Sequence, residues 1–600
     1  MTNSTKNVYV FGASRTDGDA TMKNLLGGKG ANLAEMCRLG IAVPSGFTIS
    51  TEVCTVYTAQ GKDAVAKLIA DEVKAGVAFL EQEMGKKFGD PSDPLLLSVR
   101  SGSRASMPGM MDTILNLGLN DEAVAGLARK AGNERFAWDS YRRFVQMYGD
   151  VVMGLKPVSK EEHDPFEVVI DMLKEKKGVQ LDTELTTDDL KELVARFKGL
   201  IRARVGREFP NDPWEQLWGS VMAVFQSWNN DRAIVYRELN DIPDSWGTAV
   251  NVQAMVFGNL GENSGTGVAF TRDAATGEDL FNGEFLINAQ GEDVVAGTRT
   301  PQQVTLEGSR RWAELALVNE EDRRTKYPSL EELMPDIYKQ LLVAETKLEQ
   351  HYKDMQDVEF TIQEGRLWML QTRNGKRTGA AMVRIAMEML RQGMIDEKEA
   401  LRRVSPERLN ELLHPVFDPV SVKKARSIAH GLPASPGAAT GQIVFFADEA
   451  EEWVRKGRAV ILVRQETSPE DLRGMSVANG ILTARGGMTS HAAVVARGMG
   501  KCCISGAGAV HVDYHARSMT VGGETFAEGA WLSLDGSTGE VYEGQVPTKE
   551  AELTGDFGAL MELADKYKRL GVRANADTPD DAKAARAFGA SSAASPNNSL

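Results

Sequence analysis

Residues 480–497 read GILTARGGMTSHAAVVAR. The apolar run at 480–484 predicts a strand, the glycine pair that follows predicts a loop, and the remainder predicts a helix that opens at about Ser490. His491 would then lie in the first helical turn, where unpaired backbone N–H groups and the helix dipole favour an anion. A neutral imidazole is a competent nucleophile near neutral pH. The segment therefore predicts an α/β unit whose histidine can carry a phosphoryl group.

The residues around this histidine fit the same interpretation. Gly486 and Gly487 allow the backbone to approach a bound group closely, and Thr489 and Ser490 offer hydroxyl donors. The local pattern alone also fits a histidine that merely caps a helix, and that alternative stays open at this point.

Two glycine-rich segments near the N-terminus suggest a site for a polyphosphate. GGKG at residues 27–30 places Lys29 on a flexible loop before a helix, and SVRSG at residues 98–102 flanks Arg100 with small residues. A lysine and an arginine on such turns can clamp phosphate groups. Each segment alone also fits an ordinary structural turn.

A hairpin further along the chain supplies the complementary charges. In the strand DVEFTI, Asp357 and Glu359 share one face. A three-residue loop at 363–365 would place Gln371 and Arg373 on that same face, whereas a two-residue loop would shift the register and break the arrangement. Two carboxylates beside bound phosphates suit Mg²⁺. A half-solvated hairpin with ordinary charges is the alternative.

Composition limits the classes of function. The chain has a net charge of -15, which argues against a general binder of nucleic acid or anionic membranes. Its four cysteines form no CxxC pair, which fits a reducing compartment, and no run approaches the roughly 18 apolar residues that cross a bilayer. We expect a cytoplasmic protein. The final Asn598-Ser599-Leu600 resembles a peroxisomal address only loosely, and a peroxisome-like organelle is the alternative.

Several longer runs, in order, resemble the pyruvate, phosphate dikinase family of phosphoenolpyruvate-utilising enzymes over about residues 6–590. They are NLLGGKGANLAEM, SVRSGSRASMPGMMDTILNLGLND, GEFLINAQGEDVVAGTRTPQ, LQTRNGKRTG, GLPASPGAATG, TARGGMTSHAAVVARGMGKCC and LDGSTGEVYEG. Twelve consecutive positions, 486–497, match the phosphohistidine signature of these enzymes. This match favours a phosphorylated histidine over a simple helix cap.

The resemblance implies particular roles for individual residues. His491 would be the phosphorylated intermediate, and Thr489 matches a threonine that is regulated by phosphorylation in plant relatives. Arg573 matches the first substrate-binding arginine of the family's pyruvate barrel. The metal ligands for Mg²⁺ would be Asp357 and Glu359, and the nucleotide-binding residues would be Lys29, Arg100, Glu284, Gln290, Glu292, Gln371 and Arg373.

The resemblance also implies a multidomain α/β and α+β architecture. We expect an ATP-grasp nucleotide domain at 1–377 with a helical insertion at about 121–240, a helical linker at 378–428, and a swivelling phosphohistidine α/β domain at 429–545. Residues 546–600 would hold a linker helix and the truncated start of a TIM barrel, remnant of the pyruvate/phosphoenolpyruvate site, with a disordered tail SSAASPNNSL.

The family's full reaction converts ATP, phosphate and pyruvate into AMP, pyrophosphate and phosphoenolpyruvate, and its full-length members are expected to form homodimers. Because the barrel's other arginines, its metal carboxylates and its proton-donating cysteine have no counterpart here, we expect this chain to retain only the ATP and phosphate half-reaction. The alternatives are a phosphoenolpyruvate synthase, which uses water in place of phosphate, and a catalytically silent nucleotide-binding or dimer-partner module.

Overall fold

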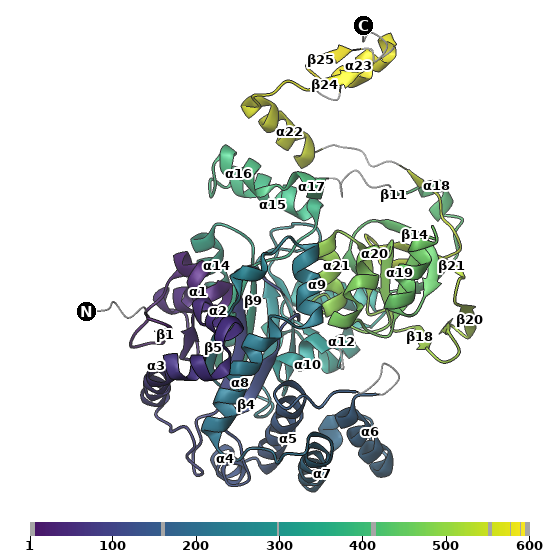
Figure 1. Ribbon diagram of the computed structural model, residues 1–600. Helices are drawn as coiled ribbons and strands as arrows, with labels where there is room; N and C mark the ends of the chain where they lie inside the picture. Colours follow the sequence, from purple (N-terminus) through teal and green to yellow (C-terminus); the bar gives the residue numbers. More distant parts are fainter. Residues whose placement is uncertain are drawn as a thin grey trace.

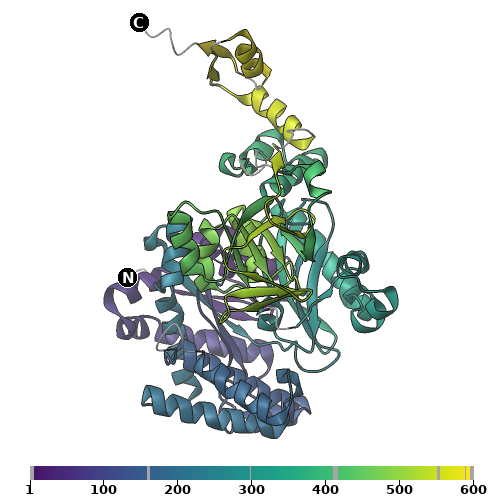
Figure 2. The same ribbon diagram turned by 90° about the vertical axis from the view of Figure 1, so that its right-hand side faces the viewer.

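The computed structural model describes residues 6–107, 109–157, 163–296, 299–409, 416–549, 555–576, 578–587 and 590–594. Three sheets form the main body, which Figure 1 shows with its first elements in purple and the histidine-bearing unit in green. The last elements, in yellow, project away from the body in both Figure 1 and Figure 2. The chain is therefore a multidomain α/β protein.

The first sheet is antiparallel and has five strands in the order β1-β2-β5-β3-β4. Its central strands β2 and β5 are buried along their whole length, as expected when both faces of a sheet are covered. The strands and the helices beside them are β1 (Val8–Phe11), β2 (Gly46–Ile49), β3 (Leu97–Ser103), β4 (Thr113–Leu117), β5 (Thr248–Ala254), α1 (Lys23–Arg38), α2 (Thr51–Gln60) and α3 (Lys62–Met84).

Helices fill the chain between β4 and β5. Local signals set their ends: the side chain of Asn133 caps α5, Asp164 precedes the first-turn proline of α6, and Thr186 and Asp189 form a capping box at α7. The helices are α4 (Ala123–Ala131), α5 (Glu134–Val151), α6 (Pro165–Lys177), α7 (Thr187–Val205), α8 (Pro213–Ser227) and α9 (Asp231–Leu239).

A second five-stranded antiparallel sheet has the order β10-β9-β6-β7-β8. Val358, Phe360 and Ile362 of β9 are fully buried beneath α14, which leaves the alternate side chains of that strand for the opposite face. The elements are β6 (Gly265–Phe270), β7 (Asn282–Ile287), β8 (Gln302–Gln303), β9 (Gln356–Gln363), β10 (Arg366–Asn374), α10 (Gly291–Ala296), α11 (Leu306–Leu315), α12 (Glu320–Lys326), α13 (Leu330–Leu333) and α14 (Pro335–Tyr352).

The linking helices lead to the third sheet. They are α15 (Gly379–Arg391), α16 (Glu397–Arg403) and α17 (Pro406–Leu409), followed by the short elements β11 (Val416–Phe417) and α18 (Pro419–Val422), where β11 pairs with β23 (Thr548–Lys549). The eight-stranded sheet then follows in the order β12-β22-β21-β14-β15-β16-β17-β13, with parallel pairing from β14 to β17.

The strand, loop and helix expected around His491 are confirmed. The strand is β16 (Gly480–Thr483), Ser490 is the N-cap, and α21 (His491–Met499) returns to β17 (Cys502–Ser505). The remaining elements of this unit are β12 (Ser427–His430), β13 (Leu432–Ser435), β14 (Ala438–Val444), α19 (Ala447–Arg455), β15 (Val460–Arg464), α20 (Leu472–Val477), β18 (Val510–Asp513), β19 (Ser518–Val521), β20 (Glu524–Ala527), β21 (Trp531–Asp535) and β22 (Glu540–Glu543).

The histidine-bearing unit packs directly against the N-terminal part of the chain. Helix α20 contacts α9, and one continuous hydrophobic cluster includes Tyr236 of α9 and Leu472 and Met475 of α20. An ion pair of 3.2 Å joins Arg232 to Glu470 at the same contact. Removing apolar surface from water is favourable by roughly 25 cal/mol per Å². The shared hydrophobic cluster therefore stabilises the contact between the two units.

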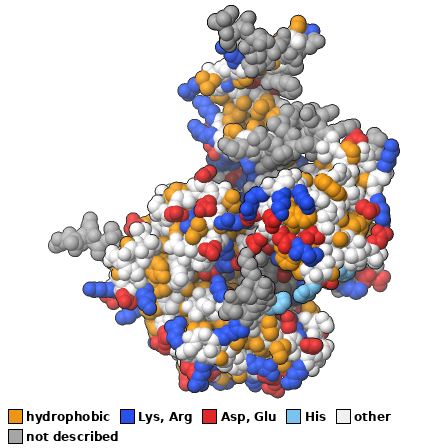
Figure 3. All heavy atoms as spheres, turned by 45° about the vertical axis from the view of Figure 1, so that its right-hand side comes forward, with side chains coloured by type: hydrophobic (Ala, Val, Ile, Leu, Met, Phe, Trp, Pro, Cys, Tyr) orange, Lys and Arg blue, Asp and Glu red, His pale blue; other side chains and the backbone are white. Residues whose placement is uncertain are grey.

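The projecting C-terminal part contains α22 (Asp556–Tyr567), β24 (Arg573–Asn575), α23 (Pro579–Ala587) and β25 (Ser592–Ala594). Residues 592–594 pair in parallel with β24, so the prediction of a disordered tail from residue 591 is wrong for them. Residues 595–600 lie outside the described ranges. Figure 3 shows hydrophobic side chains gathered on this part, in which Leu570 and Val572 are exposed.

None of the helices in the described ranges combines the length and the apolar character needed to span a membrane.

Candidate functional site

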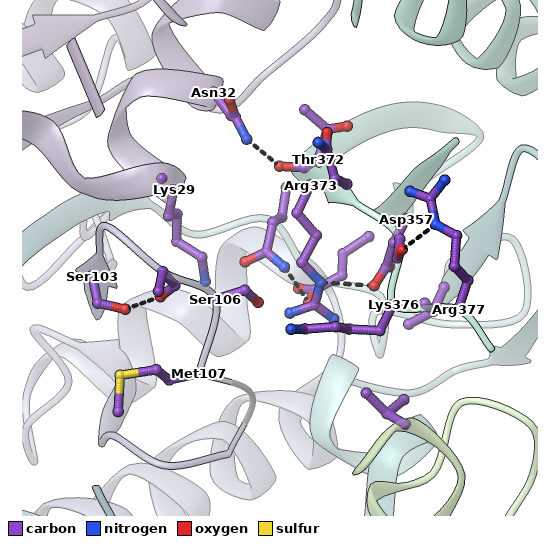
Figure 4. Close-up of a pocket in the computed structure, with 18 of the residues that line it drawn as sticks. Lys29, Asn32, Ser103, Ser106, Met107, Asp357, Thr372, Arg373, Lys376 and Arg377 are labelled. Atoms are coloured by element: carbon purple, nitrogen blue, oxygen red, sulfur yellow. Dashed lines mark hydrogen bonds and ion pairs between the residues drawn. The ribbon is translucent and has the colours of Figure 1, made fainter. Parts of the chain in front are cut away.

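A cavity of about 760 Å³ lies where the two antiparallel sheets meet the histidine-bearing unit. Residues from α1, from the β3–β4 connection, from β9 and β10 and from α21 line it. Figure 4 shows Lys29, Arg373 and Lys376 extending into this space. We call it the central cavity. Among the described residues that line it, seven are basic and three are acidic, although the whole chain carries a net charge of -15. The cavity is therefore suited to a polyanion.

The hairpin β9–β10 places Asp357, Glu359, Gln371 and Arg373 on one face, as predicted, but its loop and its strand register differ from the prediction. The loop has two residues, Glu364 and Gly365, both with positive φ (49° and 74°), and the three-residue loop was wrong. This turn pairs Gln363 with Arg366, which alone would place the wrong face of β10 opposite the carboxylates.

A bulge returns Gln371 and Arg373 to the predicted face. The pairing shifts between Met369 and Gln371, so that Glu359 lies opposite Gln371 and Asp357 lies opposite Arg373. Gln371 Nε2 donates to Glu359 Oε1 at 2.9 Å, and Arg373 Nε donates to Asp357 Oδ2 at 2.7 Å. The four side chains therefore share one face at the central cavity.

The two carboxylates have opposite electrostatic environments. Burial raises the pKa of Asp357, although Arg373 opposes the shift. Burial also acts on Glu359, but the neighbouring Lys29 and Arg373 outweigh it and lower the pKa of that carboxyl. Asp357 Oδ1 is buried and has no hydrogen-bond partner in the described part of the chain. An unpartnered carboxylate oxygen at a cation-lined cavity is a position for a ligand.

These carboxylates also pass a chemical test for Mg²⁺. Asp357 Oδ1 is unpartnered and Glu359 lies two residues along the same face, which gives two hard oxygen donors at the cavity. Mg²⁺ typically takes one or two carboxylates together with substrate phosphates. The described residues contain no cluster of three or more His, Cys, Asp or Glu side chains that would form a closed metal site. The donors fit a nucleotide-bound magnesium ion.

Lys29 reaches the cavity because α1 is interrupted at Gly27. The φ of Gly27 is +66°, and a Cβ atom there would lie 1.7 Å from the carbonyl oxygen of Gly102. Asn32 Nδ2 donates to the carbonyl of Thr372 at 2.7 Å and joins α1 to the hairpin, as Figure 4 shows. Burial lowers the pKa of Lys29 to about 7, with a further contribution from Arg100.

His491 is the first residue of α21 and lines the same cavity. Its Nδ1 lies 3.0 Å from Thr467 Oγ1, while its Nε2 is buried without a hydrogen-bond partner in the described structure. With the ring proton on Nδ1 and donated to Thr467, Nε2 keeps its lone pair. Burial lowers the pKa of His491 to about 4, opposed by Glu470. The ring is therefore neutral and nucleophilic at neutral pH.

The loop before His491 binds a carboxylate of the second sheet. Glu284 of β7 accepts hydrogen bonds from Thr489 Oγ1 at 2.8 Å and from the backbone N–H groups of Met488 and Thr489 at 3.1 and 3.3 Å. Ser490 Oγ instead accepts from Ala493 N–H and contacts Ser505. The two hydroxyls expected to donate to a phosphoryl group are thus engaged elsewhere in this arrangement.

Comparisons with known proteins agree with this geometry. Residues 23–394 match the family model "pyruvate phosphate dikinase, AMP/ATP-binding domain", and residues 457–539 match "PEP-utilising enzyme, mobile domain". The chain belongs to the pyruvate, phosphate dikinase family. It is 57% identical over 584 residues to the pyruvate, phosphate dikinase of Clostridium symbiosum, covering 97% of this chain and 63% of that protein.

Other relatives in the family are nearly as similar. The pyruvate, phosphate dikinase of Rhizobium meliloti (strain 1021) is 54% identical over 97% of this chain and 63% of its own length. The chloroplastic protein of Mesembryanthemum crystallinum is 54% identical over 98% of this chain and 58% of its own. The chain thus spans about 60% of the length of these curated relatives.

The described residues predicted for this family's chemistry lie in four places. Lys29, Asp357, Glu359, Gln371, Arg373, Thr489 and His491 line the central cavity. Arg100 and Gln290 line a small adjoining cavity, and Arg100 approaches Glu359 at 4.0 Å. Glu284 binds the loop before His491, and Arg573 lies in the projecting β24. Glu292 belongs to α10, but its side chain lies outside the described residues.

Sequence reasoning missed Thr467, Lys376 and Arg377. Thr467 lies 24 residues before the histidine that it contacts, so no local pattern links the two residues. Lys376 and Arg377 follow the hairpin within NGKRTG, a segment used above only for the family resemblance, and two adjacent cations there were a usable signal.

Proposed function

We propose that this chain carries out the ATP- and phosphate-dependent half of the pyruvate, phosphate dikinase reaction through a phosphohistidine at position 491. One observation carries the proposal: the unpartnered Nε2 of His491 belongs to a residue that lines the same cation-rich cavity as Lys29 and Arg373. A nucleophile and a polyanion site are thus placed in one cavity, as transfer of a phosphoryl group requires.

The proposed chemistry has two balanced steps. In the first, the lone pair of Nε2 attacks the β-phosphorus of ATP, the bond between that phosphorus and the α–β bridging oxygen breaks, and AMP leaves with the electron pair. In the second, an oxygen of inorganic phosphate attacks the terminal phosphorus of the histidine-bound diphosphate. The bridging bond breaks, pyrophosphate leaves, and one phosphoryl group stays on Nε2.

The residues of the cavity have distinct parts in this proposal. Lys29 and Arg373 bind the phosphates of ATP. Arg100, which lines the adjoining cavity, offsets the negative charge of Glu359. Asp357 and Glu359 would hold Mg²⁺, which offsets phosphate charge when bound. Gln290, Glu292 and Gln371 complete the nucleotide site as predicted from the resemblance. Glu284 we assign to holding the histidine loop, because that is where its carboxylate binds.

The rest of the family reaction is a proposal for the whole protein. The match of residues 457–539 to a mobile domain supports a histidine-bearing unit that swivels between the central cavity and a pyruvate/phosphoenolpyruvate site. Arg573 is the one residue that we assign to that second site, in the start of a TIM barrel. The homodimer, the regulation of Thr489 and the cytoplasmic location stay predictions. The absence of disulfides among the four cysteines supports the last of these.

The proposal is tested by following the products. Purified protein is incubated with Mg-ATP, with and without inorganic phosphate, and AMP, pyrophosphate and orthophosphate are measured while intact mass reports any acid-labile adduct. We expect AMP together with pyrophosphate that depends on added phosphate. Orthophosphate released without added phosphate would identify a synthase, and the absence of both adduct and AMP would identify a silent nucleotide-binding module.

The pKa of Lys29 makes a separate prediction about protons. At pH 8 a lysine with a pKa of about 7 is mostly neutral in the empty cavity, and phosphate binding favours its charged form. We expect Mg-ATP binding to take up close to one proton at pH 8 and little at pH 6, and the affinity to weaken as the pH rises above 7. Calorimetry in buffers of different ionisation enthalpy measures the uptake.

The control for this prediction is Lys29→Met, in which the uptake should fall by most of its value at pH 8. Equal proton uptake in the variant and the parent would show that Lys29 is not the group that titrates.

A further inference from the structure

Lys376 is a cation of the central cavity that has no carboxylate partner. It lies in the connection between β10 and α15 and lines the cavity, yet its ammonium group makes no hydrogen bond or ion pair with any described residue. Figure 4 shows its side chain extending toward Arg373, from the wall opposite Lys29. A charged lysine on a cavity wall is costly without a counterion, so an anionic ligand that binds there would be stabilised.

The neighbours of Lys376 make this imbalance stronger. Arg373 is paired with Asp357 at 2.7 Å, and Arg377 is paired with Asp354 at 2.7 Å. The nearby carboxylates are therefore engaged by other cations. Burial lowers the pKa of Lys376, and Arg408, Arg373 and Arg377 lower it further. The empty cavity thus holds several like charges close together, which an anion would relieve.

Lys376 and His491 line the same cavity, and one side chain joins the loop of Lys376 to the far end of the helix that begins at His491. Arg408 donates to the carbonyls of Gly498 and Arg497 at the end of α21, at 2.8 and 2.9 Å, and also to the carbonyl of Arg377. The loop that carries Lys376 is therefore joined to the histidine helix through one side chain. His491 and Val494 of that helix line the same cavity.

Lys29 has a different environment. Its surroundings include the carboxylate of Glu359, which raises its pKa and opposes the effect of burial. Lys376 has no such carboxylate among the groups that shift it. The two lysines thus suit two different phosphate groups: Lys29 suits one that shares the cavity with the proposed Mg²⁺ ligands, and Lys376 suits one bound at the opposite wall of the cavity.

We propose that Lys376 binds a tetrahedral phosphate dianion in the cavity that His491 also lines, at a subsite separate from that of Lys29. The inference rests on the proposed function for its place in the reaction: such a dianion is inorganic phosphate awaiting transfer, or the terminal phosphate of ATP. As the acceptor, the bound phosphate uses one oxygen to attack the terminal phosphorus of the histidine-bound diphosphate. The bond between that phosphorus and the bridging oxygen breaks, the inner phosphoryl group keeps the electron pair and stays on Nε2, and pyrophosphate leaves. Lys376 offsets the charge that two anions bring together.

The test compares Lys376→Met and Lys376→Arg with Lys67→Met, which removes an exposed lysine of α3 that makes no hydrogen bond or ion pair with any described residue. Three quantities are measured: the affinity for Mg-ATP and for AMP by calorimetry, the half-saturating phosphate concentration for pyrophosphate release, and phosphate binding to AMP-loaded protein by ³¹P NMR line broadening. The NMR measurement requires no turnover.

If the bound anion is inorganic phosphate, Lys376→Met should raise the half-saturating phosphate concentration roughly 10- to 100-fold and weaken the phosphate binding that NMR detects. The affinity for ATP should then be unchanged. If the bound anion is the terminal phosphate of ATP, Lys376→Met should weaken the affinity for ATP by the same factor and leave the affinity for AMP unchanged. Lys376→Arg should restore most of either loss, and Lys67→Met should match the parent.

An effect below about twofold on both phosphate and ATP would overturn the proposal, as would an equal loss of AMP affinity. These results are distinct from a failure of the proposed function. In that case the parent protein forms no adduct and no pyrophosphate, while the NMR comparison still reports whether Lys376 binds phosphate.

Discussion

A His491→Ala variant should gain no phosphoryl mass from Mg-ATP, whereas the parent protein should gain an acid-labile adduct. The imidazole supplies the attacking atom in the proposed first step. Its Nε2 is buried, has no hydrogen-bond partner among the described residues, and belongs to a residue that lines the cavity. The loss should exceed about a thousandfold, which is the scale observed when a covalent nucleophile is removed. Intact-mass measurement at neutral pH, repeated after acid treatment, gives the result directly.

Two controls make this result specific to position 491. His511→Ala removes an exposed histidine of β18 and should label as the parent does. Calorimetry should also show that His491→Ala still binds Mg-ATP, because the phosphate-binding cations belong to other elements. A stable adduct in His491→Ala, or a parent adduct that maps to another residue, would refute the phosphohistidine.

The local part of this site is readable from sequence because it depends on neighbours along the chain. Ser490 caps the helix that begins at the next residue, by accepting from the N–H of Ala493, and the glycine loop joins an apolar strand to that helix. Position 491 therefore follows from short-range rules. The alternation in β9 likewise places Asp357 and Glu359 on one face without knowledge of the fold. Helix capping therefore predicts the position of His491, and the two-residue periodicity of a strand predicts the shared face of Asp357 and Glu359.

The hairpin register could not be derived in the same way. Two errors of opposite sign cancelled: the loop is one residue shorter than expected, and the bulge between Met369 and Gln371 adds one residue back. Nothing in the composition of LWMLQ identifies the bulge. The contact of Glu284 with Thr489 spans 205 residues and depends on how two separate units pack. The contact of Thr467 with His491 spans 24 residues and depends on how the histidine-bearing unit folds. Such contacts require the three-dimensional structure.

Gly487→Ala should prevent the histidine loop from packing against the second sheet, even though the histidine-bearing unit keeps its own fold. A Cβ atom at this position would lie 2.4 and 2.5 Å from the two carboxylate oxygens of Glu284. Gly487 is not among the residues with positive φ, so alanine adds no backbone strain. The carboxylate would have to leave the N–H groups of Met488 and Thr489, and we expect adduct formation to fall roughly 10- to 100-fold.

The matched control is Gly498→Ala in α21, where an added Cβ atom would meet nothing within 4 Å. This variant should label His491 at the rate of the parent and should gain stability, by about 0.4–1 kcal/mol, because alanine restricts the unfolded chain. Circular dichroism and thermal unfolding of both variants establish that the fold is retained. A Gly487→Ala protein that labels as fast as Gly498→Ala would show that the contact with Glu284 is not needed for phosphoryl transfer.

A double-mutant cycle assigns the loss to that contact. Glu284→Ala removes the acceptor for three hydrogen bonds and should itself slow adduct formation. If Gly487→Ala acts only by displacing the same carboxylate, the double variant should be no slower than Glu284→Ala alone, because the second change has nothing left to disrupt. If the fold-reductions of the two single variants multiply in the double variant, alanine at position 487 disturbs His491 through its own loop and not through Glu284. The cycle therefore separates packing between the two units from the local geometry of the nucleophile.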